Sequence, residues 1–479
     1  MQYKWTAVWV TTVGIMMAGI DTRIVVVGLP SIAAQLHADA EEAIWIGQAY
    51  LLAGTVCLLL VGRISDLFGK VKIYNIGFII LTLGSAFCAL SQTPFELIVA
   101  RVVQGTGYAI IVVNSSAIIT DASPKEELGA MLGVNVTAWR LGSIAGLTLS
   151  GLILALVDWR GLFYINIPVG IFGTVWAYKA LHEIGTKDTS KKMDWTGFAL
   201  FATGLTLVLL AVTYLSYGIS GSSLGYALLV IGFVLIALFF RAESKARFPL
   251  LDMRLFRIRL FTAGNLAQLM NGLVFSGFTL LAAFYLQIGL GYTPLQSGLA
   301  IIPLEATYLV FSLIGGKLSD KYGSRALSTV GLLVTALGIL YSASFTSATQ
   351  YSEVAIMLGI IGVGNGLFTS PNSRAIMGSV PANRRGIASG FRTTMYNVGF
   401  TASYGLVILL ITLGVPYTTL TSLLQGATTS YLARVEFING CRISAIIFAI
   451  IEGVAIIPSA MRGPKEVQVP VGLEGHGSD

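Results

Sequence analysis

Residues 62–70 read GRISDLFGK, and residues 316–325 read GKLSDKYGSR. Both segments have the pattern Gly-x-x-Ser-Asp-x-x-Gly beside basic residues, with Asp66 and Asp320 at matching positions. A repeat separated by about half of the chain indicates two duplicated halves and not a solenoid of short units. If each segment follows the second helix of its half, the layout is six helices, two extra helices and six further helices.

The apolar runs around these segments predict a membrane protein. Of the 479 residues, 55% are hydrophobic and 11% are charged, whereas soluble domains carry about 25% charged residues. A membrane-spanning helix needs about 20 mostly apolar residues. On this criterion we expect an all-α polytopic membrane protein with fourteen spans, near residues 5–27, 44–61, 73–90, 95–119, 129–156, 163–180, 196–215, 224–240, 261–286, 296–314, 326–345, 351–370, 387–413 and 440–459.

The repeat and the spans together predict four parts of the chain. Residues 1–180 would form an amino-terminal six-helix bundle, and residues 261–460 a carboxy-terminal one. Residues 181–260 would hold linker segments with two extra transmembrane helices, and residues 461–479 a cytoplasmic tail. Parallel repeats with sites at their interface are typical of secondary transporters.

The basic residues predict the orientation in the membrane. If both termini are cytoplasmic, most of the 30 Lys and Arg residues lie on the cytoplasmic side, and only Arg160 and Arg434 fall in opposite-side loops. This asymmetry follows the positive-inside rule. It explains the net charge of +7 without nucleic-acid binding. We therefore expect a multi-pass protein that is embedded in the lipid bilayer of the cell membrane.

Asp21 and Arg101 are charged residues inside predicted spans, where charge is costly. Counting about 1.5 Å per residue, each lies about 9 Å below the outer boundary of its span. The two can neutralise each other if their helices are neighbours. Asp21 is then either a proton carrier whose proton affinity changes with water access or half of a static ion pair. Arg23 lies on a different face of the same helix, and would snorkel outward or face another partner.

Small residues in the fifth predicted span indicate close helix packing. Gly142, Gly146 and Ser150 are spaced four apart, which is typical of a seam where two backbones touch. In the preceding span, Arg101, Gln104 and Gly105 share one face, and the glycine would allow a neighbouring helix to approach. Arg140 lies away from the seam at mid-span. It would face a cavity or form an internal structural pair.

Polar residues in the later spans predict a central cavity. Glu305 would be a cation-binding group or a second protonation site, so it joins Asp21 and Arg101 as a candidate for proton coupling. A second set would line the substrate cavity together with Arg140; its members are Asn265, Gln268, Asn271, Tyr308, Arg392 and Tyr396. For the three amide residues the alternative is interhelical hydrogen bonding, and Arg392 could instead snorkel. Glu452 has no role that the sequence explains.

The two repeated loops predict conformational latches. A carboxylate between two helices can bind backbone N–H groups and nearby basic residues. The residues expected to form these latches are Gly62, Asp66, Gly69, Gly316, Asp320, Gly323 and Arg325. The chain has neither a Gly-x4-Gly-Lys-Ser/Thr phosphate loop nor a nucleophile–base constellation, so we expect neither ATP-driven transport nor an enzyme.

Together these residues resemble the major facilitator superfamily, specifically its fourteen-helix drug:proton antiporter branch. GRISDLFGK is similar to the first-loop motif, with Leu67 where a basic residue is usual. RVVQGTG (101–107) is similar to the helix-4 motif, which implies that Arg101 takes part in proton transfer. GIDTRIVVVGLP (19–30) resembles the helix-1 motif, with Arg23 in place of the usual Thr. Further resemblances lie in DWRGLFYINIPVG (158–170), DWTG (194–197), FPLLDMRLF (248–256) and LGYTPLQSGLAIIP (290–303).

The resemblance implies a proton-coupled exporter of amphipathic small molecules that works by alternating access. The proton gradient would be its energy source, no cofactor is expected, and a monomer is the family default. The fifth span departs from the family, because LGSIAGLTLSGL (141–152) lacks the usual Gly-Pro pairs and their kink. Two alternatives remain: an exporter of an anionic metabolite or lipid, since embedded arginines outnumber embedded acids, and a membrane sensor without a transport cycle.

Overall fold

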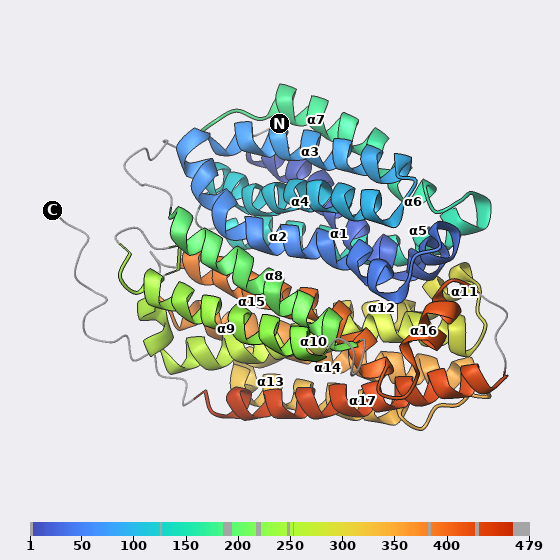
Figure 1. Cartoon of the computed structure of the whole chain (residues 1–479). Helices are drawn as coiled ribbons and strands as arrows, with labels where there is room; N and C mark the ends of the chain where they lie inside the picture. The colour runs from blue at the N-terminus through green and yellow to red at the C-terminus, as the bar shows by residue number, and fades with distance from the viewer. Residues whose placement is uncertain are drawn as a thin grey trace.

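The computed structural model describes residues 3–124, 127–184, 194–216, 222–246, 250–251, 253–381, 385–426 and 431–462. Within these ranges the chain is helical and contains no strand (Figure 1). Among the described residues, thirteen helices are long and apolar enough to cross a membrane. A fourteenth is α2, if its two segments, which meet at 53°, are taken as one span. The predicted all-α polytopic architecture is therefore confirmed.

The amino-terminal half comprises α1 to α7, drawn in blue to teal in Figure 1. In this half α1 packs most closely on α5, α2 on α4, and α3 on both α4 and α7. The sixth span is broken into the short α6 and the longer α7. The helices are α1 (Tyr3–Leu36), α2 (Ala40–Phe68), α3 (Lys70–Leu90), α4 (Pro94–Ala122), α5 (Leu128–Leu156), α6 (Gly161–Tyr164) and α7 (Asn166–Ala180).

The carboxy-terminal half comprises α10 to α17, in which α10 packs on α15 and α14 packs on both α12 and α13. The tenth span is broken between α11 and α12, and a short π-helix, η3 (Tyr285–Gly289), follows α10. The helices are α10 (Arg259–Phe284), α11 (Pro294–Ala300), α12 (Ile302–Tyr322), α13 (Ser324–Ser342), α14 (Tyr351–Gly378), α15 (Arg385–Ile411), α16 (Tyr417–Leu424) and α17 (Tyr431–Ala460).

The two extra helices, α8 (Trp195–Ser216) and α9 (Ser222–Glu243), pack on each other. Helix α8 also contacts α15 and α2, so the pair lies beside the line where the halves meet, in green in Figure 1. A short 3-10 helix, η2 (Met253–Arg257), leads into α10. Helix α7 ends at Ala180 and α17 ends at Ala460. The division of the chain into four parts remains a prediction.

Helix α1 is longer than the sequence predicted. The span was expected to end near Val27, but the helix continues through Pro30 to Leu36. A proline removes one backbone donor and kinks a helix without always ending it. The left-handed conformation of His37, with φ 52°, ends the helix. Asp39 then caps α2 through a capping box with Glu42.

The halves meet at the face opposite the chain ends. We call the face where α1 begins and α17 ends the terminal face, and the opposite one the far face. At the far face, the Glu41 backbone N–H donates to the Tyr417 hydroxyl at 3.0 Å, and Gln425 Nε2 donates to the His37 carbonyl at 3.1 Å. Deeper in the molecule, Gln287 Nε2 donates to the Val27 carbonyl at 3.0 Å. The two halves are therefore in contact at the far face.

Candidate functional site

A cluster of polar side chains surrounds Asp21 of α1. The carboxylate is fully buried. Its Oδ1 accepts hydrogen bonds from Gln104 Nε2 at 2.9 Å and from Asn166 Nδ2 at 2.8 Å. Its Oδ2 lies 3.4 Å from Arg101 Nη1. Helices α1, α4 and α7 thus converge on one carboxylate. Asp21 and Arg101 meet as expected. The depth estimate for Asp21 assumed that the helix ends near Val27, whereas α1 ends at Leu36.

Arg101 is fixed by helix α2 as well as by Asp21. Its Nε donates to the Ile46 carbonyl at 3.1 Å, and its guanidinium lies 4.0 Å from the centre of the Tyr50 ring. Its Nη1 also donates to Gln104 Oε1 at 2.5 Å. Helix α2 can come this close because Gly105 faces the Tyr50 carbonyl, where a Cβ atom would collide. The arginine therefore has acceptors and a ring face besides the carboxylate.

This arrangement can accommodate Asp21 with or without a proton. The charged carboxylate is compensated by Arg101 and by two amide donors, which a buried charge requires. If Asp21 takes a proton, Arg101 still has the Ile46 carbonyl and Gln104 Oε1 as acceptors. Neither state leaves the guanidinium without a hydrogen bond. A carboxylate with this property can serve as a reversible proton site.

Arg23 reaches the other half of the molecule from a different face of α1. It is fully buried, so the expectation of outward snorkelling is wrong and the alternative of a separate partner holds. Its Nη2 lies 3.6 Å from Glu305 Oε1, and its Nε donates to Ser143 Oγ at 3.3 Å. Arg140 Nη1 lies 3.9 Å from Glu305 Oε2. Glu305 thus contacts two arginines in a cluster separate from that of Asp21.

Other expected cavity residues surround this second cluster. Tyr308 accepts a hydrogen bond from Arg140 Nη2, and its ring lies 3.8 Å from the Arg140 guanidinium. Arg392 interacts electrostatically with Arg140 and Tyr308. Tyr396 is partly buried on the same helix as Arg392, and its carbonyl faces Gly272 of α10. These residues therefore stand near the junction of the halves.

The three amide residues of α10 have hydrogen bonds within the carboxy-terminal half. Gln268 Oε1 accepts from Asn372 Nδ2 of α14 at 2.9 Å. Asn271 Nδ2 donates to Glu452 Oε1 of α17 at 2.9 Å, and Asn265 Nδ2 donates to the Phe261 carbonyl of its own helix. For Gln268 and Asn271 these bonds match the alternative of interhelical hydrogen bonding, whereas the bond of Asn265 stays within α10. The cavity lining remains a prediction for all three residues.

The predicted seam on α5 lies against α1. Gly142 faces the Met16 carbonyl and Gly146 faces the Ile20 carbonyl, and a Cβ atom at either position would collide. Ser150 Oγ would lie 3.4 Å from a Cβ atom at Gly28. The seam places Arg23 beside Ser143 and so aims it at the other half.

The first loop is capped by a residue that the sequence did not single out. Glu183 Oε1 accepts the backbone N–H groups of Val71 at 2.9 Å and Lys72 at 3.1 Å, at the start of α3. This is the role expected of Asp66, which instead lies in the last turn of α2. The reason is that α2 continues through Asp66, so its carboxylate precedes the turn that it was expected to cap.

The glycines after these helices have the backbone that the turns need. Gly69 has φ 107° and Gly323 has φ 82°, a region that favours glycine. Gly62 and Gly316 lie within α2 and α12, and Arg325 is exposed in the first turn of α13. The side chain of Asp320 lies outside the described part of the structure. The latch function of both loops remains a prediction.

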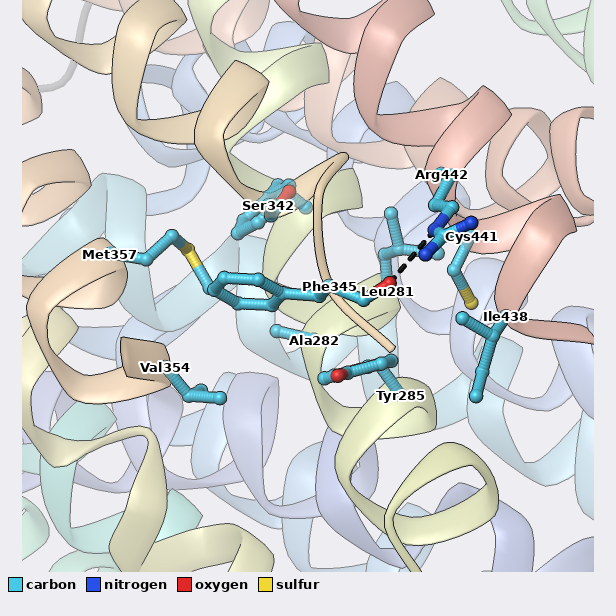
Figure 2. Close-up of a pocket in the computed structure, with 11 residues that line it drawn as sticks. Leu281, Ala282, Tyr285, Ser342, Phe345, Val354, Met357, Ile438, Cys441 and Arg442 are labelled. Atoms are coloured by element: carbon cyan, nitrogen blue, oxygen red, sulfur yellow. Dashed lines mark hydrogen bonds between the residues drawn. The ribbon is translucent and has the colours of Figure 1, made fainter. Parts of the chain in front are cut away.

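A hollow lies inside the carboxy-terminal half, near the far face (Figure 2). It is mostly apolar and is lined by α10, η3, α13, α14 and α17 together with the loop after α13; among its residues are Phe278, Tyr285, Phe345, Met357 and Cys441. Arg442 Nε donates to the Phe345 carbonyl at 2.8 Å, so this guanidinium holds the loop after α13. None of the expected site residues lines the hollow, which we therefore separate from the candidate site.

Two partners of the Asp21 cluster were missed as site residues. Asn166 begins α7 directly after the break that follows α6, and Ser85 of α3 accepts from Gln104 Nε2 at 2.7 Å. The signal for Asn166 was a polar residue inside the apolar run YINIPVG. A lone serine in a span carries no such signal.

Comparisons with known proteins agree with this architecture. The family model described as Major Facilitator Superfamily matches residues 11–404. The chain is 30% identical over 400 residues to Riboflavin transporter RibZ of Clostridioides difficile (strain 630), covering 84% of this chain and 86% of that protein. It is 29% identical over 404 residues to Multidrug resistance protein Stp of Mycobacterium tuberculosis (strain CDC 1551 / Oshkosh), covering 83% of this chain and 74% of that protein.

Solved structures show the same fold. A bacterial homolog of the human lysosomal transporter Spinster, in an inward-facing and occupied conformation, matches with a TM-score of 0.70 at 15% identity, over 96% of this chain and 97% of that one. The expected fold and family are thus confirmed. This multi-pass membrane transporter belongs to the Major Facilitator Superfamily.

Proposed function

We propose that the chain is a proton-coupled exporter that exchanges amphipathic small molecules for protons by alternating access. The relatives named as multidrug resistance proteins support export of small molecules. The distribution of basic residues supports a terminal face in the cytoplasm of the cell, with both chain ends there. We take the working unit to be a monomer that needs no cofactor and uses the proton gradient as its energy source.

The observation that carries this proposal is the environment of Asp21. A fully buried carboxylate is held by one guanidinium and two amides from α4 and α7. Protonation removes the attraction between α1 and Arg101 and leaves Arg101 attached to α2 through the Ile46 carbonyl. A proton taken up here would loosen α1 from α4 and so favour rearrangement of the amino-terminal half. Release of the proton restores the attraction.

The test uses purified protein in proteoliposomes with an acidic lumen and a panel of cationic, neutral and anionic dyes. We expect dye uptake to collapse when a protonophore dissipates the pH gradient. Asp21→Asn should abolish gradient-driven uptake, because asparagine cannot release a proton. The same variant should still exchange labelled for unlabelled dye across the membrane, since this process needs no proton release.

The matched control is Asp158→Asn, a change of the same chemistry at an exposed carboxylate of the far face. It should transport like the wild type. Proton coupling at Asp21 is refuted if Asp21→Asn retains gradient-driven uptake. Uptake that ignores the protonophore would refute proton coupling altogether.

A further inference from the structure

Arg23, Arg140 and Glu305 bring two guanidiniums and one carboxylate together where the halves meet. Arg23 and Glu305 are fully buried, and Arg140 is mostly buried. Arg392 adds a third positive charge in electrostatic range of Arg140. Among the described residues of this cluster, Glu305 is the sole acid. Buried charge without an equal countercharge is costly, so the cluster has capacity for a further anion.

The hydrogen bonds in the cluster are also incomplete. The contacts of Glu305 with Arg23 and Arg140 measure 3.6 and 3.9 Å, whereas a charge-assisted hydrogen bond measures about 2.7–2.9 Å. Within the described structure, Arg23 Nη1 and Nη2, Arg140 Nη1 and both Glu305 oxygens have no hydrogen-bond partner. Ion pairs that served only to hold the halves together would be more stable with shorter contacts. The unused donors match what an oxyanion requires.

Aromatic rings complete the surroundings of these donors. The Arg23 guanidinium lies 5.2 Å from the centre of the Phe400 ring and 5.9 Å from that of Phe275. The Arg140 guanidinium lies 4.8 Å from the Trp139 ring and 3.8 Å from the Tyr308 ring. Rings on both halves thus offer apolar faces beside the charged donors. A flat organic molecule that carries an anionic group matches these surroundings: its charge suits the guanidinium donors, and its aromatic body suits the rings.

We infer that Arg23 and Arg140 bind the anionic group of an aromatic organic anion, with Glu305 as the internal anion that the substrate displaces. The inference rests on the proposed exporter function and names its substrate class. In the absence of substrate, Glu305 compensates part of the positive charge. When the anionic group binds, it takes the unused guanidinium donors, and the aromatic body lies against the rings.

The experiment compares two dyes with the same three-ring xanthene body and opposite charge. Fluorescein is an anion, and rhodamine 123 is a cation. Their binding to the purified full chain is measured by fluorescence anisotropy at neutral pH without a membrane gradient. We expect fluorescein to bind and rhodamine 123 to bind at least about tenfold more weakly, since charge-assisted hydrogen bonds favour the anion by this order.

The variants separate a binding site from a structural bridge. Arg23→Gln should weaken fluorescein binding by about tenfold or more, and Arg23→Lys should weaken it less, because the charge is kept. Glu305→Gln removes the competing carboxylate and should tighten fluorescein binding. The control Arg160→Gln alters an arginine at the far face and should bind like the wild type. Size-exclusion chromatography and thermal unfolding verify that each variant is folded.

Three results would overturn the inference. Preferential binding of rhodamine 123, lost in Glu305→Gln, would make Glu305 a cation site. Equal fluorescein affinity in the wild type and in folded Arg23→Gln and Arg23→Lys would make the cluster a structural bridge. Weaker fluorescein binding by Glu305→Gln would show that Glu305 supports the anion and is not displaced by it. The proposed exporter function is judged separately by gradient-driven uptake, so it can survive the failure of this binding test.

Discussion

Arg101 has a geometry that only arginine provides. Its Nε donates to the Ile46 carbonyl, and its Nη1 donates to the side chains of Asp21 and Gln104. The face of its guanidinium lies against the Tyr50 ring. Lysine carries the charge but lacks the planar fork. We therefore expect Arg101→Lys to reduce gradient-driven uptake by at least about tenfold, a loss of about 1.4 kcal/mol of interaction. Proteoliposome uptake measures this, and Arg160→Lys at the far face should have no effect.

Glu452 is a further buried acid, but its surroundings differ from those of Asp21. Its described partner is Asn271, whose Nδ2 donates at 2.9 Å, and no basic side chain of the described residues lies within ion-pair distance. A glutamine can replace the acid in a pair with an amide. We expect Glu452→Gln to retain uptake and thermal stability, whereas Glu452→Leu should lower stability by about 1–3 kcal/mol by leaving Asn271 unpaired. Loss of proton-driven uptake in a stable Glu452→Gln variant would contradict this view.

Individual residues show how far the sequence could predict the site. Asp21 and Arg101 could be paired because charge inside a span demands compensation. The partner of Arg23 could not be predicted, because Glu305 belongs to the other half and the sequence does not show how the halves dock. The partners of Gln268 and Asn271 could not be predicted for a similar reason. Spacing places them on α10, but only packing decides that Asn372 and Glu452 are their partners.

At the scale of elements, the seam between α1 and α5 determines where both Arg23 and Asp21 point. Gly142 faces the Met16 carbonyl, whereas Gly133 on the same helix has open space around it. We expect Gly142→Ala to destabilise the protein by about 1–3 kcal/mol through overpacking. Gly133→Ala should stabilise it by about 0.5–1 kcal/mol, because glycine is costly inside a helix. Thermal unfolding in detergent measures both, and a stable Gly142→Ala variant would show that the seam can separate without cost.

The lengths of the apolar runs predicted the existence and order of the spans, but the ends of the helices depended on other features. Helix α1 continues through Pro30 until His37 adopts a left-handed conformation. The spans expected near residues 163–180 and 296–314 correspond to the broken pairs α6–α7 and α11–α12. Helix α16 was missed, since eight residues are too few to produce an apolar run. Hydrophobicity detects lipid-facing length, whereas caps and breaks depend on local hydrogen bonds.

At the scale of the whole molecule, contacts at the far face hold the halves together between α1–α2 and α16. Burial raises the pKa of Tyr417 to about 12. Its hydroxyl therefore stays protonated throughout the physiological range, and its contact with the Glu41 backbone N–H does not depend on pH there. This contact therefore supplies no response of the far face to protons. An exporter must also open this face to release its substrate.

Linking the halves at the far face should therefore stop transport. We would replace His37 and Gln425, which are joined by a 3.1 Å hydrogen bond, with cysteines in a chain whose three native cysteines are changed to alanine. A short bifunctional thiosulfonate should abolish dye uptake, and a reductant should restore it.

The control pair, Ser91 and Arg160, lies at the same face within the amino-terminal half, where Arg160 Nη2 donates to the Ser91 carbonyl at 3.3 Å. Cross-linking this pair should leave uptake intact, because each half moves as a unit in alternating access. Full uptake by the cross-linked His37–Gln425 variant would mean that the far face need not open, and alternating access would be refuted for this protein.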